Sequence, residues 1–307
     1  MPQNLLIIGA TGLIGKYITK EIIKAKSSFG RIAILTSKDT THNKTSGIYD
    51  LKQSGIEVLV GDITKEEDVK SAYHGIDTVI SCVGRNVIAQ QIPLIQWASE
   101  TPVTRFFPSE YGTDIEYSLE SASEKPHQQK LKVRRYMSTV TNLEWTCLVT
   151  GPYSDLYLAE PPLGRLGAGG FNVKEKKSSL LGDGKGRISF TAMADVGRLL
   201  VAALQHPAAS RNRVLIVNSF TTSPHDILAQ FEKQTGTKWD VQYTDLGKLK
   251  EIEERAWRNQ DPLATGLTLR RIWAEGGTLY ENRDNELIGD PPMETLADQV
   301  RQAIERS

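Results

Sequence analysis

Short apolar runs recur through the first half of the chain and alternate with longer segments of mixed polarity. Each run has the length of a strand covered on both faces, and the segments between them have the length of helices. The runs cover residues 5–8, 31–35, 56–60, 77–81, 103–107 and 144–149, and the helical segments lie near 15–26, 45–53, 88–99 and 124–139. This alternation predicts an α/β fold with a Rossmann-type doubly wound parallel sheet.

Two details of this half concern helix boundaries. The polar residues between the second strand and residue 45 predict a loop. Residues 64–67, Thr-Lys-Glu-Glu, have the spacing of a capping box, which predicts that a helix begins there.

The pattern changes after residue 150. Glycine and proline concentrate in residues 161–170, which predicts a loop, and Gly182-Asp-Gly-Lys-Gly186 predicts a hairpin turn with 188–191 as its outgoing strand. A helix is predicted at 194–204, and the run 213–217 is predicted to rejoin the sheet. We therefore expect an NAD(P)-binding domain over 1–150, rejoined by about 188–217, and a smaller C-terminal substrate-binding lobe over 151–187 and 218–307.

The turn after the first strand has glycines at three positions, in the pattern Gly9-x-x-Gly12-x-x-Gly15. One glycine makes the tight turn, one lets the backbone approach a pyrophosphate, and one lets the helix pack close to the strand. The helix that begins here offers free N–H groups and the positive end of its dipole. The residues predicted to bind a dinucleotide are Gly9, Thr11, Gly12, Leu13, Ile14 and Gly15.

The end of the second strand distinguishes NADP from NAD. A cation there would hold a 2′-phosphate, whereas an acid would hold the ribose hydroxyl. Ser37 and Lys38 follow the strand and Lys44 comes shortly after, so NADPH is the predicted cofactor. Asp39 leaves NAD open as the alternative.

Composition excludes several classes of function. The 37 basic and 37 acidic residues give no net charge, so nothing favours nucleic acid or an anionic membrane as a partner. No run approaches the length of a membrane span, and no leader precedes the first strand, so the expected location is cytoplasmic. Cys82 and Cys147 lie in apolar runs and are predicted to be buried free thiols, and no metal site is expected. A small molecule is the expected partner; the oligomeric state is open, with a homodimer possible.

Three segments together resemble the isoflavone reductase and phenylcoumaran benzylic ether reductase group of the NmrA-like family. They are the glycine turn, Arg105-Phe-Phe-Pro-Ser-Glu-Tyr-Gly112, and Lys130-Leu-Lys-Val-Arg-Arg135. Gly182-Asp-Gly and Asp195-Val-Gly197 also match, so the resemblance extends through most of the chain. The residues around Tyr111, together with Glu124-Lys-Pro-His, are similar to the corresponding segments of fungal members.

The resemblance implies roles for individual residues. Lys130 matches the catalytic lysine and also adjoins the cofactor, and the segment after the fourth strand passes over the nucleotide. The loop after the fifth strand lies near the nicotinamide, and residues 150–153 line the substrate. The residues implied at the cofactor are Val83, Gly84, Pro108 and Ser109, and those implied at the substrate are Glu110, Tyr111, Tyr153 and His127.

The chain departs from the family pattern in two places. Thr150-Gly151 replaces the Ser-Asn pair that plant members usually carry, which predicts a different substrate pocket. Ser37 stands where relatives often carry an arginine on the 2′-phosphate, which keeps the choice between NADP and NAD open.

Catalysis by this chain needs an acid or base other than the tyrosine and lysine pair of ordinary short-chain dehydrogenases. None of the ten tyrosines is followed by a lysine four residues later, so the Tyr-x-x-x-Lys pair of ordinary short-chain dehydrogenases is absent. Lys130 is predicted near the carboxyl edge of the sheet, and a partly buried lysine beside a cation such as Arg134 has a lowered pKa. Without the resemblance, a lysine in this segment would be interpreted as an exposed helix charge. His127 lies on the same segment and either joins the site or is a surface histidine before the helix.

These observations predict an NADPH-dependent reductase of a small aromatic or polyketide-like secondary metabolite. Hydride would add to a conjugated C=C bond, a quinone methide or a carbonyl, with Lys130 as general acid/base. The alternatives are a redox sensor that binds the dinucleotide without turnover, and a dehydratase or isomerase that uses the same pocket.

Overall fold

The computed structural model describes residues 2–159 and 162–307. Its centre is a seven-stranded sheet with the order β10-β6-β5-β4-β1-β2-β3, in which neighbouring strands pair in parallel. The order reverses where β1 and β4 lie side by side, which confirms the predicted doubly wound sheet. The strands are β1 (Leu5–Ile8), β2 (Ile32–Thr36), β3 (Glu57–Val60), β4 (Thr78–Ser81), β5 (Arg105–Phe107), β6 (Glu144–Val149) and β10 (Arg213–Ile216).

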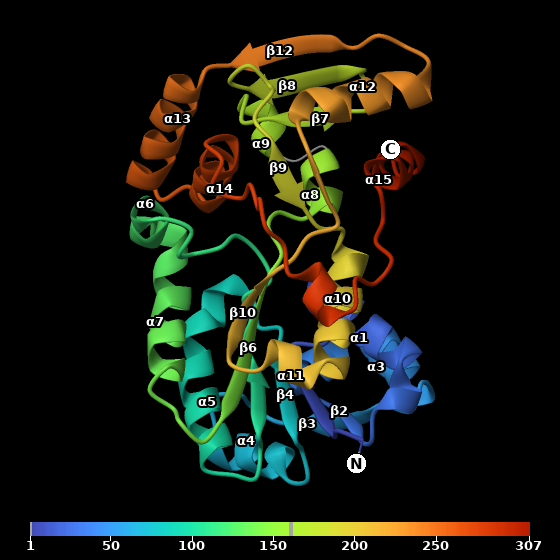
Figure 1. The fold of residues 1–307 in the computed structure, drawn as a ribbon, viewed down its shortest axis with the longest axis vertical. Helices are drawn as coiled ribbons and strands as arrows, with labels where there is room; N and C mark the ends of the chain where they lie inside the picture. Colours follow the sequence, from blue (N-terminus) through green and yellow to red (C-terminus); the bar gives the residue numbers. More distant parts are fainter. Residues whose placement is uncertain (1, 160–161) are drawn as a thin grey trace.

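Helices cover both faces of this sheet (Figure 1). One face carries α1 (Gly15–Lys24), α3 (Thr45–Gln53), α10 (Met193–Gln205) and α11 (Pro207–Ser210), and the other carries α4 (Glu66–Tyr73), α5 (Gln91–Ser99) and α7 (Gln128–Met137). Leu5 and Ile7 of β1 belong to the apolar core with α1 and α10, whereas Leu6 and Ile8 belong to the core with α4, α5 and α7. Because side chains of a strand alternate in direction, a strand between two helical layers has to be apolar throughout.

A second group of elements lies beyond the carboxyl ends of the parallel strands (Figure 1). Its core is rich in aromatic side chains, among them Phe171, Phe190 and Phe231. The strands are β7 (Gly170–Asn172), β8 (Lys177–Leu181) and β12 (Asp240–Thr244) in one sheet, and β9 (Ile188–Phe190) with β11 (Phe220–Thr222) in another. The helices are α6 (Leu119–Ser123), α8 (Ser154–Leu158), α9 (Pro162–Arg165), α12 (Pro224–Thr235), α13 (Leu246–Arg258), α14 (Ala264–Ala274) and α15 (Leu296–Glu305).

The predicted hairpin at residues 182–186 is wrong. β8 ends before these glycines and pairs with β7 and β12, while β9 follows them and pairs with β11. The glycines therefore connect two different sheets. The strand predicted at 213–217 does rejoin the large sheet, as β10 beside β6.

Three local predictions also change. The loop expected after β2 contains a short helix, α2 (Lys38–Asn43). The capping box is wrong because α4 begins at Glu66 without a side-chain cap, and the Thr64 hydroxyl donates to Asp62 instead. Of the loop expected at 161–170, residue 161 lies outside the described residues, while α9 and the start of β7 occupy part of the rest. Short 3₁₀ helices span Lys26–Ser28 (η1), Arg85–Gln90 (η2), Lys125–His127 (η3) and Asn285–Ile288 (η4).

Candidate cofactor and active site

The glycine turn joins β1 to α1 at the carboxyl edge of the sheet. Gly9 has a φ of +81°, and a Cβ there would lie 2.5 Å from the carbonyl oxygen of Cys82. A Cβ on Gly15 would overlap the Gly9 carbonyl oxygen, so this glycine lets α1 pack against the turn. A Cβ on Gly12 would find its nearest neighbour, the Gly9 oxygen, at 3.1 Å, and Gly12 lines a cavity. The turn has the geometry that close approach of a pyrophosphate requires.

A cavity of about 270 Å³ lies over this turn. The first turn of α1 contains no acidic residue. The N–H groups of Leu13, Ile14 and Gly15 have no acceptor among the described residues, so they remain available to a phosphate. Ser109 is held at the cavity by its hydroxyl, which donates to the Val83 carbonyl at 2.9 Å. The predicted cofactor residues that line this cavity are Gly12, Leu13, Ile14, Val83, Gly84, Ser109 and Lys130.

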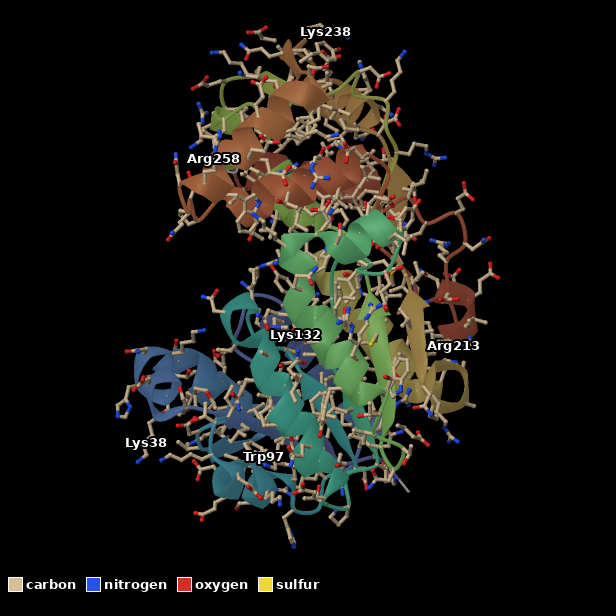
Figure 2. All side chains as sticks on the ribbon, turned by 90° about the vertical axis from the view of Figure 1, so that its left-hand side faces the viewer. Lys38, Trp97, Lys132, Arg213, Lys238 and Arg258 are labelled. Carbon is tan, nitrogen blue, oxygen red and sulfur yellow. The ribbon has the colours of Figure 1, made fainter. Side chains whose placement is uncertain are left out.

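The residues predicted to select the nucleotide lie in different places. Lys44 adjoins the glycine turn, because its Nζ donates to the carbonyl oxygen of Thr11 at 2.7 Å. Lys38 is exposed at the outer edge of the molecule (Figure 2), and the Ser37 hydroxyl caps α2. Of the two predicted lysines, only Lys44 is in contact with the turn.

A larger cavity of about 550 Å³ adjoins the first. The residues that line both are Leu13, Arg85, Tyr111, Pro126, Lys130 and Tyr153. The rest of the larger cavity is mostly apolar and aromatic, with Ile115, Leu156, Tyr157, Leu163, Leu269 and Trp273 in its lining. An aromatic-lined cavity of this size beside a glycine turn is typical of a substrate site.

Lys130 lies where the two cavities meet. Its Nζ donates to the carbonyl oxygen of Glu110 at 2.6 Å. Burial lowers the pKa of Lys130; the Glu110 carboxylate opposes this shift, and the positive charges of Arg85 and Arg134 add to it. Lys130 is therefore partly buried beside cations, as predicted. One of these cations, Arg85, was not predicted from the sequence.

Glu110 does not line either cavity, contrary to its predicted contact with substrate. Its side chain is 1% exposed and forms an ion pair with Arg134 at 3.1 Å. Arg134 also pairs with Glu116 at 2.7 Å. The predicted cofactor contact Pro108 is likewise buried without lining either cavity; its carbonyl oxygen accepts from the Glu110 N–H at 2.8 Å. These interactions fix the segment whose carbonyl oxygen holds Lys130.

His127 is buried, with 2% of its surface exposed, so the alternative of a surface histidine is wrong. Its Nδ1 lies 2.6 Å from the Ser121 carbonyl oxygen, an acceptor, so this nitrogen carries the proton. Burial lowers the pKa of His127, and Lys130 adds to the shift. His127 lines the larger cavity, and its Nε2 is buried without a hydrogen-bond partner among the described residues. A neutral histidine in this state offers Nε2 as a hydrogen-bond acceptor.

Tyr111 and Tyr153 line both cavities and are linked to each other. The Tyr153 hydroxyl donates to the Tyr111 carbonyl oxygen at 2.6 Å. Burial raises the pKa of both tyrosines, so both remain protonated near neutral pH. The Tyr153 proton is thus already engaged, which agrees with the absence of the Tyr-x-x-x-Lys pair.

Arg85, Tyr157 and Arg270 also line the larger cavity and were not predicted from the sequence. Arg85 directly follows Gly84, in the segment expected to pass over the cofactor, and that position was an available signal. Arg270 shares a helical stripe with Leu267 and Ala274, and a charge in an otherwise apolar stripe is a second signal.

Residues 1–264 match the NmrA-like family. The chain belongs to this family. It is 35% identical to the oxidoreductase aprR of Aspergillus flavus, over 95% of each chain. It is 30% identical to isoflavone reductase homolog P3 of Arabidopsis thaliana, over 82% of this chain and 81% of the relative. These relatives confirm the predicted family and the prediction of an oxidoreductase.

The fold is also found in a solved reductase. The leucoanthocyanidin reductase of Vitis vinifera, in its binary complex with NADPH, superposes with a TM-score of 0.80 over 98% of this chain and 99% of that one. The sequence identity is 18%, so the similarity establishes the architecture and nothing finer.

The predicted cysteine state agrees with the structure, since Cys82 and Cys147 are buried free thiols. In the described part of the chain, no helix is both long and apolar enough to cross a membrane. The same residues contain no group of three or more His, Cys, Asp or Glu side chains placed to hold a metal ion.

Proposed function

We propose that the protein is an NADPH-dependent reductase of a small aromatic or polyketide-like molecule, with Lys130 as general acid/base. The observation that carries this proposal is the position of Lys130, where the cavity over the glycine turn meets the larger aromatic cavity. A hydride donor and its acceptor have to lie in contact, so a proton donor at this junction can reach the group that is reduced.

The residues around the smaller cavity fit the phosphates of a dinucleotide. Gly12 leaves room for the pyrophosphate, and the residues from Leu13 to Gly15 offer N–H groups at the start of α1. Lys44 adds a cation beside the turn for a 2′-phosphate. The leucoanthocyanidin reductase of similar fold was solved with NADPH. In this proposal residues 1–150 and about 188–217 hold the nucleotide, and 151–187 with 218–307 cover the substrate.

When bound, NADPH supplies a hydride to a conjugated C=C bond, a quinone methide or a carbonyl. The Lys130 ammonium supplies the matching proton and is recharged from solvent. Its lowered pKa makes it a better proton donor near neutral pH than an exposed lysine would be. The Glu110 carbonyl oxygen orients Nζ, and the ion pair of Glu110 with Arg134 keeps that carbonyl in place.

The substrate would lie against the tyrosine rings and the histidine. The Nε2 of His127 can accept a hydrogen bond from a hydroxyl group on the substrate, because no described group already donates to it. The rings of Tyr111 and Tyr153 present apolar surface next to Lys130. An aromatic molecule with a hydroxyl group satisfies these features together.

The test compares three variants in an assay of NADPH consumption with aromatic enones, quinones and benzylic ethers. Lys130→Ala should keep NADPH affinity but lose about 10²–10⁴-fold in turnover, the usual contribution of general acid–base catalysis. Lys130→Arg should be equally inactive, because arginine does not release a proton near neutral pH. Lys132→Ala is the control, since Lys132 is exposed on the same helix (Figure 2), and it should change turnover less than about twofold.

The pH profile adds an independent criterion. If Lys130 donates the proton, the wild-type rate falls as pH rises through its lowered pKa, and this ionisation is missing from the residual rate of Lys130→Arg. Full activity of both Lys130 variants would remove the lysine from the mechanism. NADPH binding without consumption of NADPH by any of these acceptors would instead support the redox sensor.

A further inference from the structure

Arg270 is a buried positive charge that interacts with the hydroxyl and the ring of Tyr157 and not with a carboxylate among the described residues. Its side chain lies on α14, is 3% exposed, and lines the larger cavity but not the smaller one. In the described part of the chain, no carboxylate lies within ion-pair distance of it, and its Nη1 is buried without a hydrogen-bond partner. Burial lowers the pKa of Arg270, which expresses the cost of keeping the charge there.

Two aromatic rings lie next to the Arg270 guanidinium. Its central carbon lies 3.9 Å from the ring centroid of Tyr157 and 5.6 Å from that of Trp273. Both rings also line the larger cavity. Stacking of this kind favours a cation. The rings therefore orient the guanidinium, whose Nη1 has no acceptor among the described residues.

The other buried arginines differ from Arg270 in where they lie, since neither Arg105 nor Arg134 lines either of the two cavities. Arg134 has three carboxylates within 4 Å. Arg105 donates from Nη2 to the hydroxyls of Thr146 and Ser210 at 2.5 and 2.6 Å. Taking a charge out of water is costly unless partners replace the lost hydration. Arg105 keeps its Nε and Nη1 without a partner among the described residues, and Arg270 keeps its Nη1 without one. Of these two side chains, Arg270 is the one that lines the larger cavity.

The neighbouring residue shows that α14 does not need Arg270 for its attachment. Arg271 pairs with Glu253 at 2.6 Å, with Glu124 at 2.7 Å and with Glu275 at 3.1 Å. These ion pairs hold α14 to α13 and to the segment before α7. Arg270 takes part in none of these ion pairs and lines the larger cavity instead.

We propose that Arg270 binds a carboxylate of the substrate, so that the larger cavity takes an aromatic carboxylic acid. This inference rests on the proposed function for the site, and it names the class of substrate. A planar guanidinium donates two parallel hydrogen bonds to a carboxylate, and the rings of Tyr157 and Trp273 would cover the adjoining apolar part. Since Arg270 does not line the cofactor cavity, the carboxylate is held away from the glycine turn, with the reduced group at Lys130.

The test measures binding and needs no turnover. Cinnamate and methyl cinnamate are titrated by calorimetry into the protein saturated with NADP⁺, since the two probes share a ring and a chain but only the acid is charged. Wild type should bind the acid about tenfold or more tightly than the ester, as expected for hydrogen bonds between charged groups. Arg270→Met should remove the preference, Arg270→Lys should keep part of it, and Arg258→Met, which alters an exposed arginine on α13 (Figure 2), should leave it intact.

Thermal unfolding of the same variants shows whether they remain folded, and cinnamate should raise the Tm of wild type but not of Arg270→Met. Equal binding of acid and ester by wild type, or a preference that persists in Arg270→Met, would overturn the carboxylate site. Reduction of neutral acceptors without any preference for acids would leave the proposed reductase standing and refute this inference. Binding of acids through Arg270 without NADPH consumption would support the carboxylate site and count against the proposed reductase.

Discussion

At the scale of single residues, position decides the role of a charge more than its presence in a motif. Lys38 and Lys44 are equivalent in the sequence, as cations near the end of β2. In the structure Lys38 is exposed at the edge, while Lys44 donates to the Thr11 carbonyl oxygen in the glycine turn. A 2′-phosphate bound beside the turn would therefore meet Lys44 first.

This difference gives a prediction about cofactor choice. Wild type should bind NADPH more tightly than NADH, and Lys44→Ala should reduce that preference by about tenfold, the loss of one charge-assisted contact. Lys38→Ala serves as the matched control and should keep the preference within about twofold. Titration of both nucleotides into each protein by fluorescence or calorimetry measures it. Equal affinity of wild type for the two nucleotides would mean that neither lysine binds the 2′-phosphate.

At the scale of elements, the sequence predicted best where burial is complete. Runs such as residues 5–8 are apolar because helices cover both faces, and this constraint leaves little choice of structure. The hairpin at 182–186 failed because glycines specify a turn but not which strands it joins, and that depends on distant strands such as β11 and β12. The helix α2 was missed because six polar residues carry no apolar periodicity.

Two glycines within helices differ in the space that a side chain would have. A Cβ on Gly197 of α10 would lie 2.7 Å from the carbonyl oxygen of Tyr17 in α1, whereas a Cβ on Gly47 of α3 would meet nothing within 4 Å. Gly197→Ala should therefore lower the free energy of unfolding by about 1–3 kcal/mol through overpacking. Gly47→Ala should raise it by about 0.5–1 kcal/mol, because alanine favours the helix. Urea denaturation followed by circular dichroism compares the two, and equal effects would show that α1 and α10 separate easily.

At the scale of the whole molecule, the candidate site is assembled from both groups of elements. Lys130 comes from a helix on the large sheet, and Arg270 comes from α14 beyond the carboxyl ends of the strands. The glycine turn was predictable because its residues are adjacent in the sequence and each has a defined backbone requirement. The surroundings of Arg270 were not predictable, since whether a carboxylate lies near a buried arginine is a property of the folded molecule, and among the described residues none does.

Cofactor binding should therefore appear as a change in the stability of the whole molecule. A ligand that binds only the folded state adds about 2.7 kcal/mol at a hundred times its Kd, so NADPH should raise the Tm of wild type by several degrees. Gly12→Val should abolish this shift, because its side chain would fill space in the cavity over the turn, where the pyrophosphate approaches. Its Tm without ligand should fall by no more than a few degrees, since the Cβ of residue 12 would lie 3.1 Å from the Gly9 carbonyl oxygen, a tight contact that small shifts relieve. Differential scanning fluorimetry with and without NADPH measures both quantities, with Gly47→Ala as a glycine variant that should keep the full shift. An undiminished shift in Gly12→Val would show that the phosphates bind elsewhere and would remove the basis for assigning the smaller cavity to the nucleotide.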